Sequence, residues 1–164
     1  MTKDFKEVND SKQTDVEPGR PIGTDVWSPL PMNVYRANWD ASVDRINSRM
    51  GVGMVVRNWE GLVTATLRSS RSLFPDAKLA EAMATLKVVL FCKQLRISRL
   101  LLEGDALNVV NDINKETMDW SSAGLIIQDI KTELQSLEYG SAQFISRNSN
   151  CIAHCLAKEA LKLS

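Results

Sequence analysis

Residues 97–106 read ISRLLLEGDA, and this stretch decides the fold class of the chain. It is a short apolar run that follows a long helical pattern, and such a run is typical of a buried strand. A strand that follows a crossover helix usually pairs in parallel with an earlier strand of the same sheet. Residues 97–103 therefore predict an α/β protein whose sheet is partly parallel.

Three strands are predicted before that helix. Residues 33–40 (NVYRANWD) alternate loosely and contain residues that favour strands. Residues 51–57 (GVGMVVR) and 62–68 (LVTATLR) are rich in β-branched side chains, and the polar segment 58–61 (NWEG) between them predicts a hairpin turn. The chain is thus expected to start its sheet with a three-stranded antiparallel meander.

The long helix is predicted over residues 76–95, because apolar side chains recur there at helical spacing and Asp76, after Pro75, can cap it. The later predicted elements are a helix at 106–114, a helix at 122–137, a strand at 142–146 and a helix at 150–163. The predicted fold class is α/β, with a five-stranded mixed sheet of three antiparallel strands followed by parallel strands, flanked by helices.

The composition is that of one globular domain with a tail. The chain has 164 residues, of which 44% are hydrophobic and 24% charged, so it can bury one sizeable core. Residues 1–26 hold few large apolar side chains, and we interpret them as a flexible leader. The domain is expected to span residues 27–164 and to begin near Trp27.

Charge and hydropathy exclude several classes of protein. The chain has 20 Lys+Arg and 20 Asp+Glu, which argues against a broad basic surface for nucleic acid. The longest uncharged apolar run is residues 88–92, too short to cross a membrane. Three cysteines in unrelated settings suit a reducing compartment. We expect an intracellular protein, in the nucleus or the cytoplasm, without a membrane partner.

Three acidic residues stand out by position. Asp40 ends the first predicted strand, Asp105 follows the fourth, and Glu81 lies one to two turns into the long helix. If the first and fourth strands are parallel neighbours, Asp40 and Asp105 meet at one edge of the sheet, and the helix can add Glu81. Clustered carboxylates repel one another unless cations neutralise them, and oxygen ligands favour Mg²⁺ or Mn²⁺. The arrangement indicates two-metal phosphoryl hydrolysis.

Each of these residues also has a structural interpretation. Asp105 can be the N-cap of the helix that follows it, and Glu81 can be a solvated helix residue, although the side chains around it are apolar.

Cys151, His154 and Cys155 share one side of the last predicted helix and suggest half of a zinc site. A structural zinc site needs four ligands, so packing of the cysteines is the favoured interpretation.

Basic side chains are spread along the chain rather than clustered, and we interpret each as a solvated surface residue. They are Arg36, Arg57, Arg68, Arg71, Lys78, Lys87, Lys93 and Arg147.

The chain resembles the plant-type ribonuclease H-like domains, which are related to the ribonuclease H of retrotransposons. The resemblance covers about residues 27–163 and rests on six motifs in order. They are Trp27-x-Pro29, NWDAS, GVGMVVR followed by Gly61, LAEAMA, LLLEGDA followed by Val109-Val110, and RNSNCIAHCLAKEA.

The resemblance implies a ribonuclease H fold and a metal-dependent endonuclease that hydrolyses the RNA strand of RNA–DNA hybrids. It carries catalytic and metal-binding roles onto Asp40, Glu81 and Asp105, with Mg²⁺ as the cofactor and Mn²⁺ as a substitute. It adds a fourth catalytic residue, His154, where the commonest ribonuclease H pattern has aspartate and the plant-type branch has histidine. The expected partner is an RNA–DNA hybrid, bound by a monomer.

Two departures from the pattern support an alternative function. Ala41 follows the first aspartate where glycine is common, and Ala106 follows Asp105 where serine is frequent. The alternative is a catalytically weak or inactive module that kept the fold for binding nucleic acid or protein.

Overall fold

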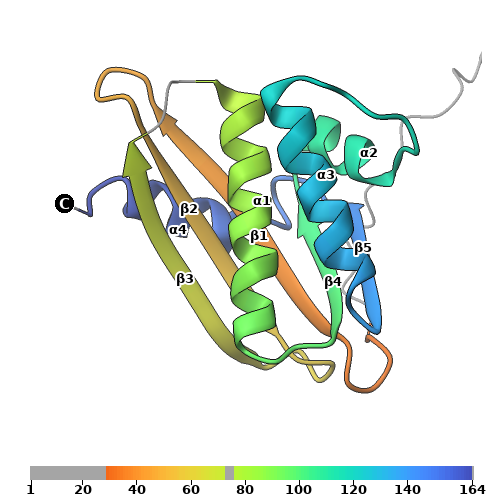
Figure 1. Ribbon diagram of the computed structural model, residues 1–164. Coiled ribbons are helices and arrows are strands. Elements are labelled where there is room, and N and C mark those ends of the chain that lie inside the picture. The colour runs from red at the N-terminus through yellow and green to blue at the C-terminus, as the bar shows by residue number, and fades with distance from the viewer. Residues whose placement is uncertain (1–28, 73–75, 164) are drawn as a thin grey trace, which may run out of the picture.

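The computed structural model describes residues 29–72 and 76–163 (Figure 1). The predicted leader at residues 1–26, together with Trp27 and Pro75, lies outside the described residues. The elements of the described part follow in the predicted order. They are β1 (Tyr35–Asp44), β2 (Arg49–Arg57), β3 (Val63–Ser72), α1 (Ala77–Gln94), β4 (Arg99–Gly104), α2 (Leu107–Asn114), α3 (Ser122–Gln135), β5 (Tyr139–Phe144) and α4 (Cys151–Ala160).

The sheet has five strands in the order β3-β2-β1-β4-β5. β1 pairs with β2 and β2 with β3 in antiparallel fashion, while β4 pairs in parallel with both β1 and β5. The predicted fold class is therefore confirmed. α1 is the crossover from β3 to β4, and it brings β4 beside β1 at the centre of the sheet.

Helices cover both faces of the sheet. α1 and α3 lie together over one face, and α4 lies behind the other, where it crosses β1, β2 and β3 (Figure 1). The face under α1 and α3 holds the main apolar core, as the alternation of side chains along β1 and β2 requires. Its largest fully buried side chains are Trp39, Met50, Met54, Leu100, Leu102 and Ile130.

Two glycines let α4 lie directly on the backbone of β2. A Cβ atom on Gly51 would lie 2.2 Å from the carbonyl oxygen of Ala157, and one on Gly53 would lie 2.2 Å from that of Ala153. Any side chain at these positions would collide with the helix backbone. This close contact fixes the height of α4 above the strand that neighbours β1.

All five strands differ from the prediction at one end or both, and the largest differences are at the ends of β1 and β3 and at the start of β5. β1 runs on to Asp44, so Asp40 lies within the strand and not at its end. The additional residues pair with β2, where Ser42 lies opposite Gly51. β5 begins at Tyr139 rather than at residue 142, because pairing with β4 places Arg99 opposite Tyr139 and carries Gly140 into the strand. Sheet pairing overrides the weak strand preference of glycine there.

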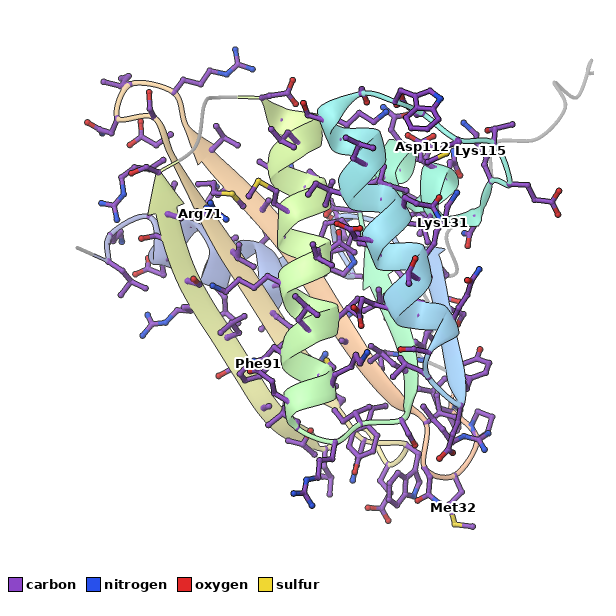
Figure 2. The ribbon with its side chains drawn as sticks, viewed as in Figure 1. Met32, Arg71, Phe91, Asp112, Lys115 and Lys131 are labelled. Atoms are coloured by element: carbon purple, nitrogen blue, oxygen red, sulfur yellow. The ribbon has the colours of Figure 1, made fainter. Side chains whose placement is uncertain are left out.

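An ion-pair cluster forms where α2 meets α3, at the margin of the molecule (Figure 2). Lys115 Nζ lies 3.1 Å from Asp112 Oδ1, and Lys131 Nζ donates a 2.5 Å hydrogen bond to the carbonyl oxygen of Lys115. Lys78 on α1 adds a 2.8 Å contact to Asp112. These basic side chains are paired within the domain.

Within residues 29–72 and 76–163, no helix has both the length and the apolar character needed to span a bilayer.

Candidate active site

Asp40 lies on the face of β1 that is covered by α4. It alternates with Trp39 and Ala41, which face the apolar core, and its side chain is only 1% exposed. The Oδ2 atom lies 2.7 Å from His154 Nδ1, while the buried Oδ1 atom has no hydrogen-bond partner. Burial is the main cause that raises the pKa of Asp40 above its usual value, and the charge of Asp105 adds to it.

Glu81 reaches the same place from the second turn of α1. The helix is started by Asp76, whose Oδ1 accepts a 2.7 Å hydrogen bond from the Leu79 amide, as predicted. The backbone amide of Ala41 donates to the Glu81 carboxylate, but the buried Oε2 atom has no partner. Burial, followed by the charges of Asp40 and Asp105, raises the pKa of Glu81 to about 8. Glu81 is thus not a solvated helix residue.

Asp105 follows β4, as predicted, but it does not cap α2. The N-cap position belongs to Ala106, which offers no side-chain bond. The Asp105 carboxylate instead accepts hydrogen bonds from the segment before α4. Arg147 Nε donates to Oδ2 at 3.0 Å, and Asn150 Nδ2 donates to Oδ1 at 2.9 Å. The alternative interpretation of Asp105 as a helix cap is therefore wrong.

His154 enters the site from α4. The helix buries Ala153, Ala157 and Ala160 against the sheet, and His154 lies at the margin of that face with its side chain 22% exposed. Its Nδ1 atom is bound to Asp40, so the other ring nitrogen, Nε2, is available for a different partner. The four residues singled out by sequence thus come from four separate elements: β1, α1, the end of β4, and α4.

The donor set fits a divalent cation in three respects. The three carboxylates are close enough that Asp40 and Asp105 raise the pKa of Glu81 and Asp105 raises that of Asp40. Two buried carboxylate oxygens, on Asp40 and Glu81, have no hydrogen-bond partner. Oxygen ligands of this kind are what Mg²⁺ and Mn²⁺ prefer.

The third carboxylate is differently placed. Both oxygens of Asp105 already accept hydrogen bonds, and one of the donors is the guanidinium of Arg147. Among the described residues, no three His, Cys, Asp or Glu side chains are already arranged to hold one metal ion. Binding a cation at this place therefore requires some movement around Asp105.

A pocket of about 350 Å³ opens beside the acidic residues. It is lined by Glu81, Asp105, Ala106, Phe144 and Arg147. The Arg147 side chain is 66% exposed, so the lining of the pocket combines two carboxylates with an exposed positive charge. This combination suits a phosphate group bridged to the carboxylates by a cation.

Several polar contacts near the site were not anticipated from the sequence. Arg147 and Arg36 were interpreted as solvated surface residues, but Arg147 pairs with Asp105, and the buried Arg36 lies 3.1 Å from Glu103. Asn38 Nδ2 donates to Glu103 at 2.8 Å. Asn38 and Glu103 stand two residues before Asp40 and Asp105, and the period of two along a strand is the signal that places them on one face.

The cysteines have different environments. Cys92 is buried, and burial raises the pKa of its thiol to about 12. Cys151 and Cys155 are exposed on α4, so the packing interpretation is correct for Cys92 alone.

The sheet order, with an acidic site at the centre of the sheet, defines a ribonuclease H-like fold, and known structures support this. RNase H1 from Halobacterium salinarum superposes with a TM-score of 0.72 at 19% identity, over 78% of this chain and 97% of that one. The N-terminal RNase H domain of rv2228c from Mycobacterium tuberculosis gives 0.68 at 16% identity, over 78% and 93%. LC11-RNase H1, isolated from compost and solved with an RNA/DNA hybrid, gives 0.68 at 12% identity, over 78% and 96%.

A comparison of the sequence with protein-family models identifies the family of the chain. Residues 38–160 match the family described as reverse transcriptase-like, and the chain belongs to that family. The match includes all four candidate site residues. A search among curated proteins found no match.

Proposed function

We propose that this protein is a metal-dependent endonuclease that hydrolyses the RNA strand of RNA–DNA hybrids. The observation that carries the proposal is the meeting of three carboxylates with two unpartnered oxygens on Asp40 and Glu81. Burying such a cluster is unfavourable, and a purely structural domain has no use for it. The histidine at position 154, where aspartate is commoner, supports our proposal that the chain is of the plant-type branch.

Asp40, Glu81 and Asp105 would hold two Mg²⁺ ions, with Mn²⁺ able to replace them. When bound, the ions would supply positive charge for the phosphate oxygens and lower the pKa of a water molecule. Asp40, whose buried Oδ1 atom has no hydrogen-bond partner, would be one of the residues that hold them. Cleavage would then leave 5′-phosphate and 3′-hydroxyl ends.

His154 would move a proton or assist the departure of the product. Its Nδ1 atom is held by Asp40, so Nε2 would be the ring nitrogen that transfers the proton. A neutral imidazole is a poor Mg²⁺ ligand, so a direct role in holding the ions is the smaller part of its proposed function.

The hybrid is the proposed substrate because relatives of the same fold bind it. LC11-RNase H1 and the foamy viral protease-reverse transcriptase have both been solved in complex with RNA/DNA hybrid. We propose that this chain, as a monomer, reads the 2′-hydroxyls of one strand and tolerates a deoxy backbone on the other.

A cleavage assay tests the proposal. Labelled RNA–DNA hybrid, single-stranded RNA, duplex RNA and duplex DNA are each incubated with the protein in Mg²⁺ and in Mn²⁺. The hybrid should be cut in its RNA strand, faster than duplex DNA in either metal, and chelation should stop the reaction. Equal cutting of hybrid and duplex DNA would contradict the proposal.

The engagement of Asp105 by Arg147 and Asn150 favours a second candidate function. The Arg147 guanidinium already places a positive charge on the Asp105 carboxylate, so the domain could bind nucleic acid or protein without a cation and without hydrolysis. Binding of the hybrid with no cleavage, even in Mn²⁺, would favour this module over the enzyme.

A further inference from the structure

Asn150 occupies an unusual position at the start of α4. It is the N-cap residue of the helix and an asparagine there normally accepts a hydrogen bond from the first turn, yet its side chain makes no such bond. The residue is 1% exposed. Its side chain is therefore turned away from the helix and into the protein.

The side-chain amide joins two of the strands that carry the acidic residues. Nδ2 donates to the carbonyl oxygen of Trp39 at 2.8 Å and to Asp105 Oδ1 at 2.9 Å. Both partners are acceptors, so the NH₂ group, and not the carbonyl, must face them. Trp39 directly precedes Asp40 on β1, so one amide group ties β1 beside Asp40 to the carboxylate that follows β4.

The backbone of Asn150 is also fixed on both sides. Its amide donates to the carbonyl oxygens of Ser146 and Arg147, both at 3.1 Å, and its own carbonyl accepts from the His154 amide at 3.0 Å. The same residue is thus connected to Asp105, to the strand of Asp40 and to the helical turn of His154.

This arrangement has two costs for stability. The first turn of α4 is left without a side-chain cap, and the buried Oδ1 atom of Asn150 has no hydrogen-bond partner. The Asn150 backbone, with φ −102° and ψ 12°, lies outside the extended region in which an N-cap side chain typically reaches the first turn. The observed rotamer instead serves the two acceptors beside the acidic cluster.

We propose that Asn150 is a positioning residue, which holds the Asp105 carboxylate at a fixed place relative to Asp40 so that both can bind the same cations. This inference rests on the proposed function. Arg147 also contacts Asp105, but it is 66% exposed, whereas Asn150 is buried and its side-chain amide makes two hydrogen bonds. The two donors therefore differ, because Arg147 can leave when a cation arrives and Asn150 stays.

The test is the binding of Ca²⁺, a hard oxygen-seeking cation, measured by calorimetry on the folded full-length chain without nucleic acid. Asn150→Ala should weaken Ca²⁺ binding by about tenfold or more, the usual effect of removing a group that orients a metal ligand. The control is Asn148→Ala, an exposed residue of the same segment, which should stay within about twofold of the wild type. Asn150→Leu, which fills the space without donors, replaces Asn150→Ala if that variant does not fold.

A second readout separates positioning from a merely structural role. With hybrid as substrate, Asn150→Ala should need more Mg²⁺ for half-maximal cleavage, while the KM for hybrid stays near that of the wild type. A lower melting temperature with unchanged Ca²⁺ affinity and Mg²⁺ requirement would overturn the inference. If the wild type binds Ca²⁺ and Asn150→Ala weakens it but no hybrid is cut, the proposed function fails and the positioning role stands. A wild type that binds no Ca²⁺ overturns the positioning inference, and the proposed function is then decided by the cleavage of hybrid in Mg²⁺ and Mn²⁺.

Discussion

The two faces of β1 are both buried, but they are built from opposite kinds of residue. Ala37 and Trp39 face α1 in the apolar core, while Asn38 and Asp40 face the side covered by α4. The first face lowers the free energy of the folded state by removing apolar surface from water. The second face buries polar groups, which is unfavourable unless each finds a partner. Because side chains alternate along β1, the residues that stabilise the fold and the candidate site residue Asp40 lie on opposite faces of the same strand.

The polar face is itself divided. Toward the start of β1, Asn38 donates to Glu103, and Arg57 Nη1 donates to Asn38 Oδ1 at 2.7 Å. Further along the strand, Asp40 and the neighbouring Glu81 each keep an oxygen without a partner. The oxygens without partners lie where the proposed cations would bind, and the hydrogen-bonded network of Asn38 joins β1 to β2 and β4.

The largest expected effect comes from the polar face. Asp40→Asn should reduce hybrid cleavage on the order of a thousandfold, because it removes a carboxylate that is proposed to hold the cations. The melting temperature should be unchanged or higher, since a buried charge is lost. Cleavage assays and thermal unfolding check this, with the exposed Asp129→Asn as the control. A fully active Asp40→Asn would remove Asp40 from the site.

Substitution of Trp39, next to Asp40 on β1, should lower the stability of the protein. Trp39→Ala removes a fully buried ring from the apolar face and should cost about 3–5 kcal/mol of unfolding free energy. Chemical denaturation measures this loss. Trp120→Ala, whose ring is 77% exposed, is the matched control and should change stability by no more than about 0.5 kcal/mol. Similar losses in both variants would contradict the division between the faces.

Burial of Glu81 should make the stability of the protein depend on pH. Its pKa in the folded protein is about 8 against an ordinary value of 4.5, so the folded state keeps a proton that the unfolded state releases. Stability should therefore fall as the pH rises from 4.5 to 8. Glu81→Gln should remove this loss, and it should be more stable than the wild type at pH 8 by on the order of 1–3 kcal/mol.

Thermal unfolding across this pH range, without divalent cations, measures the effect of Glu81. The exposed Glu138→Gln should keep the pH dependence of the wild type. A stability curve for the wild type that rises with pH through this window would show that Glu81 is ionised in the folded protein.

His154 should have a smaller effect than Asp40. His154→Ala is expected to reduce turnover by about 10- to 100-fold and to change the pH profile, with partial recovery in Mn²⁺, because its proposed task is to move a proton. His154→Asp should preserve or increase cleavage in Mg²⁺, since it restores a carboxylate beside the cations. An unchanged rate, metal preference and pH profile in His154→Ala would reduce the site to three residues.

Arg147 should give the smallest effect. It pairs with Asp105 from an exposed position, so Arg147→Gln should tighten Ca²⁺ binding by up to about fivefold, the range of an exposed ion pair. Calorimetry without nucleic acid measures this. Arg71→Gln, on the opposite edge strand, removes the same charge and should leave the affinity unchanged. Weaker binding in Arg147→Gln would mean that Arg147 helps the cation rather than competing with it.

The sequence carries enough information to predict the fold and to predict that Asp40, Glu81 and Asp105 lie close together. The helix at 76–95 and the apolar run at 97–103 predict the crossover, and the crossover brings β4 beside β1. The contacts of Arg147 and Asn150 could not be predicted, because they depend on how the segment before α4 passes the end of β4. No pattern in the segment before α4 indicates its contacts with Asp105, which is more than forty positions away. The prediction ends β1 at Asp40 for a related reason, since the later residues are strand only because β2 pairs with them.

The close seating of α4 on β2 has a consequence for how the protein tolerates change. Gly51 and Gly53 touch no reacting group, yet a methyl group on either would push against the carbonyl of Ala157 or Ala153 and lift the helix that carries His154. In a saturation mutagenesis experiment, substitutions at these two positions should reduce activity as strongly as substitutions of the candidate site residues do, and more strongly than substitutions of other strand residues. Because these two glycines have no side chain, the backbone of α4 can pack against β2 and place His154 beside Asp40.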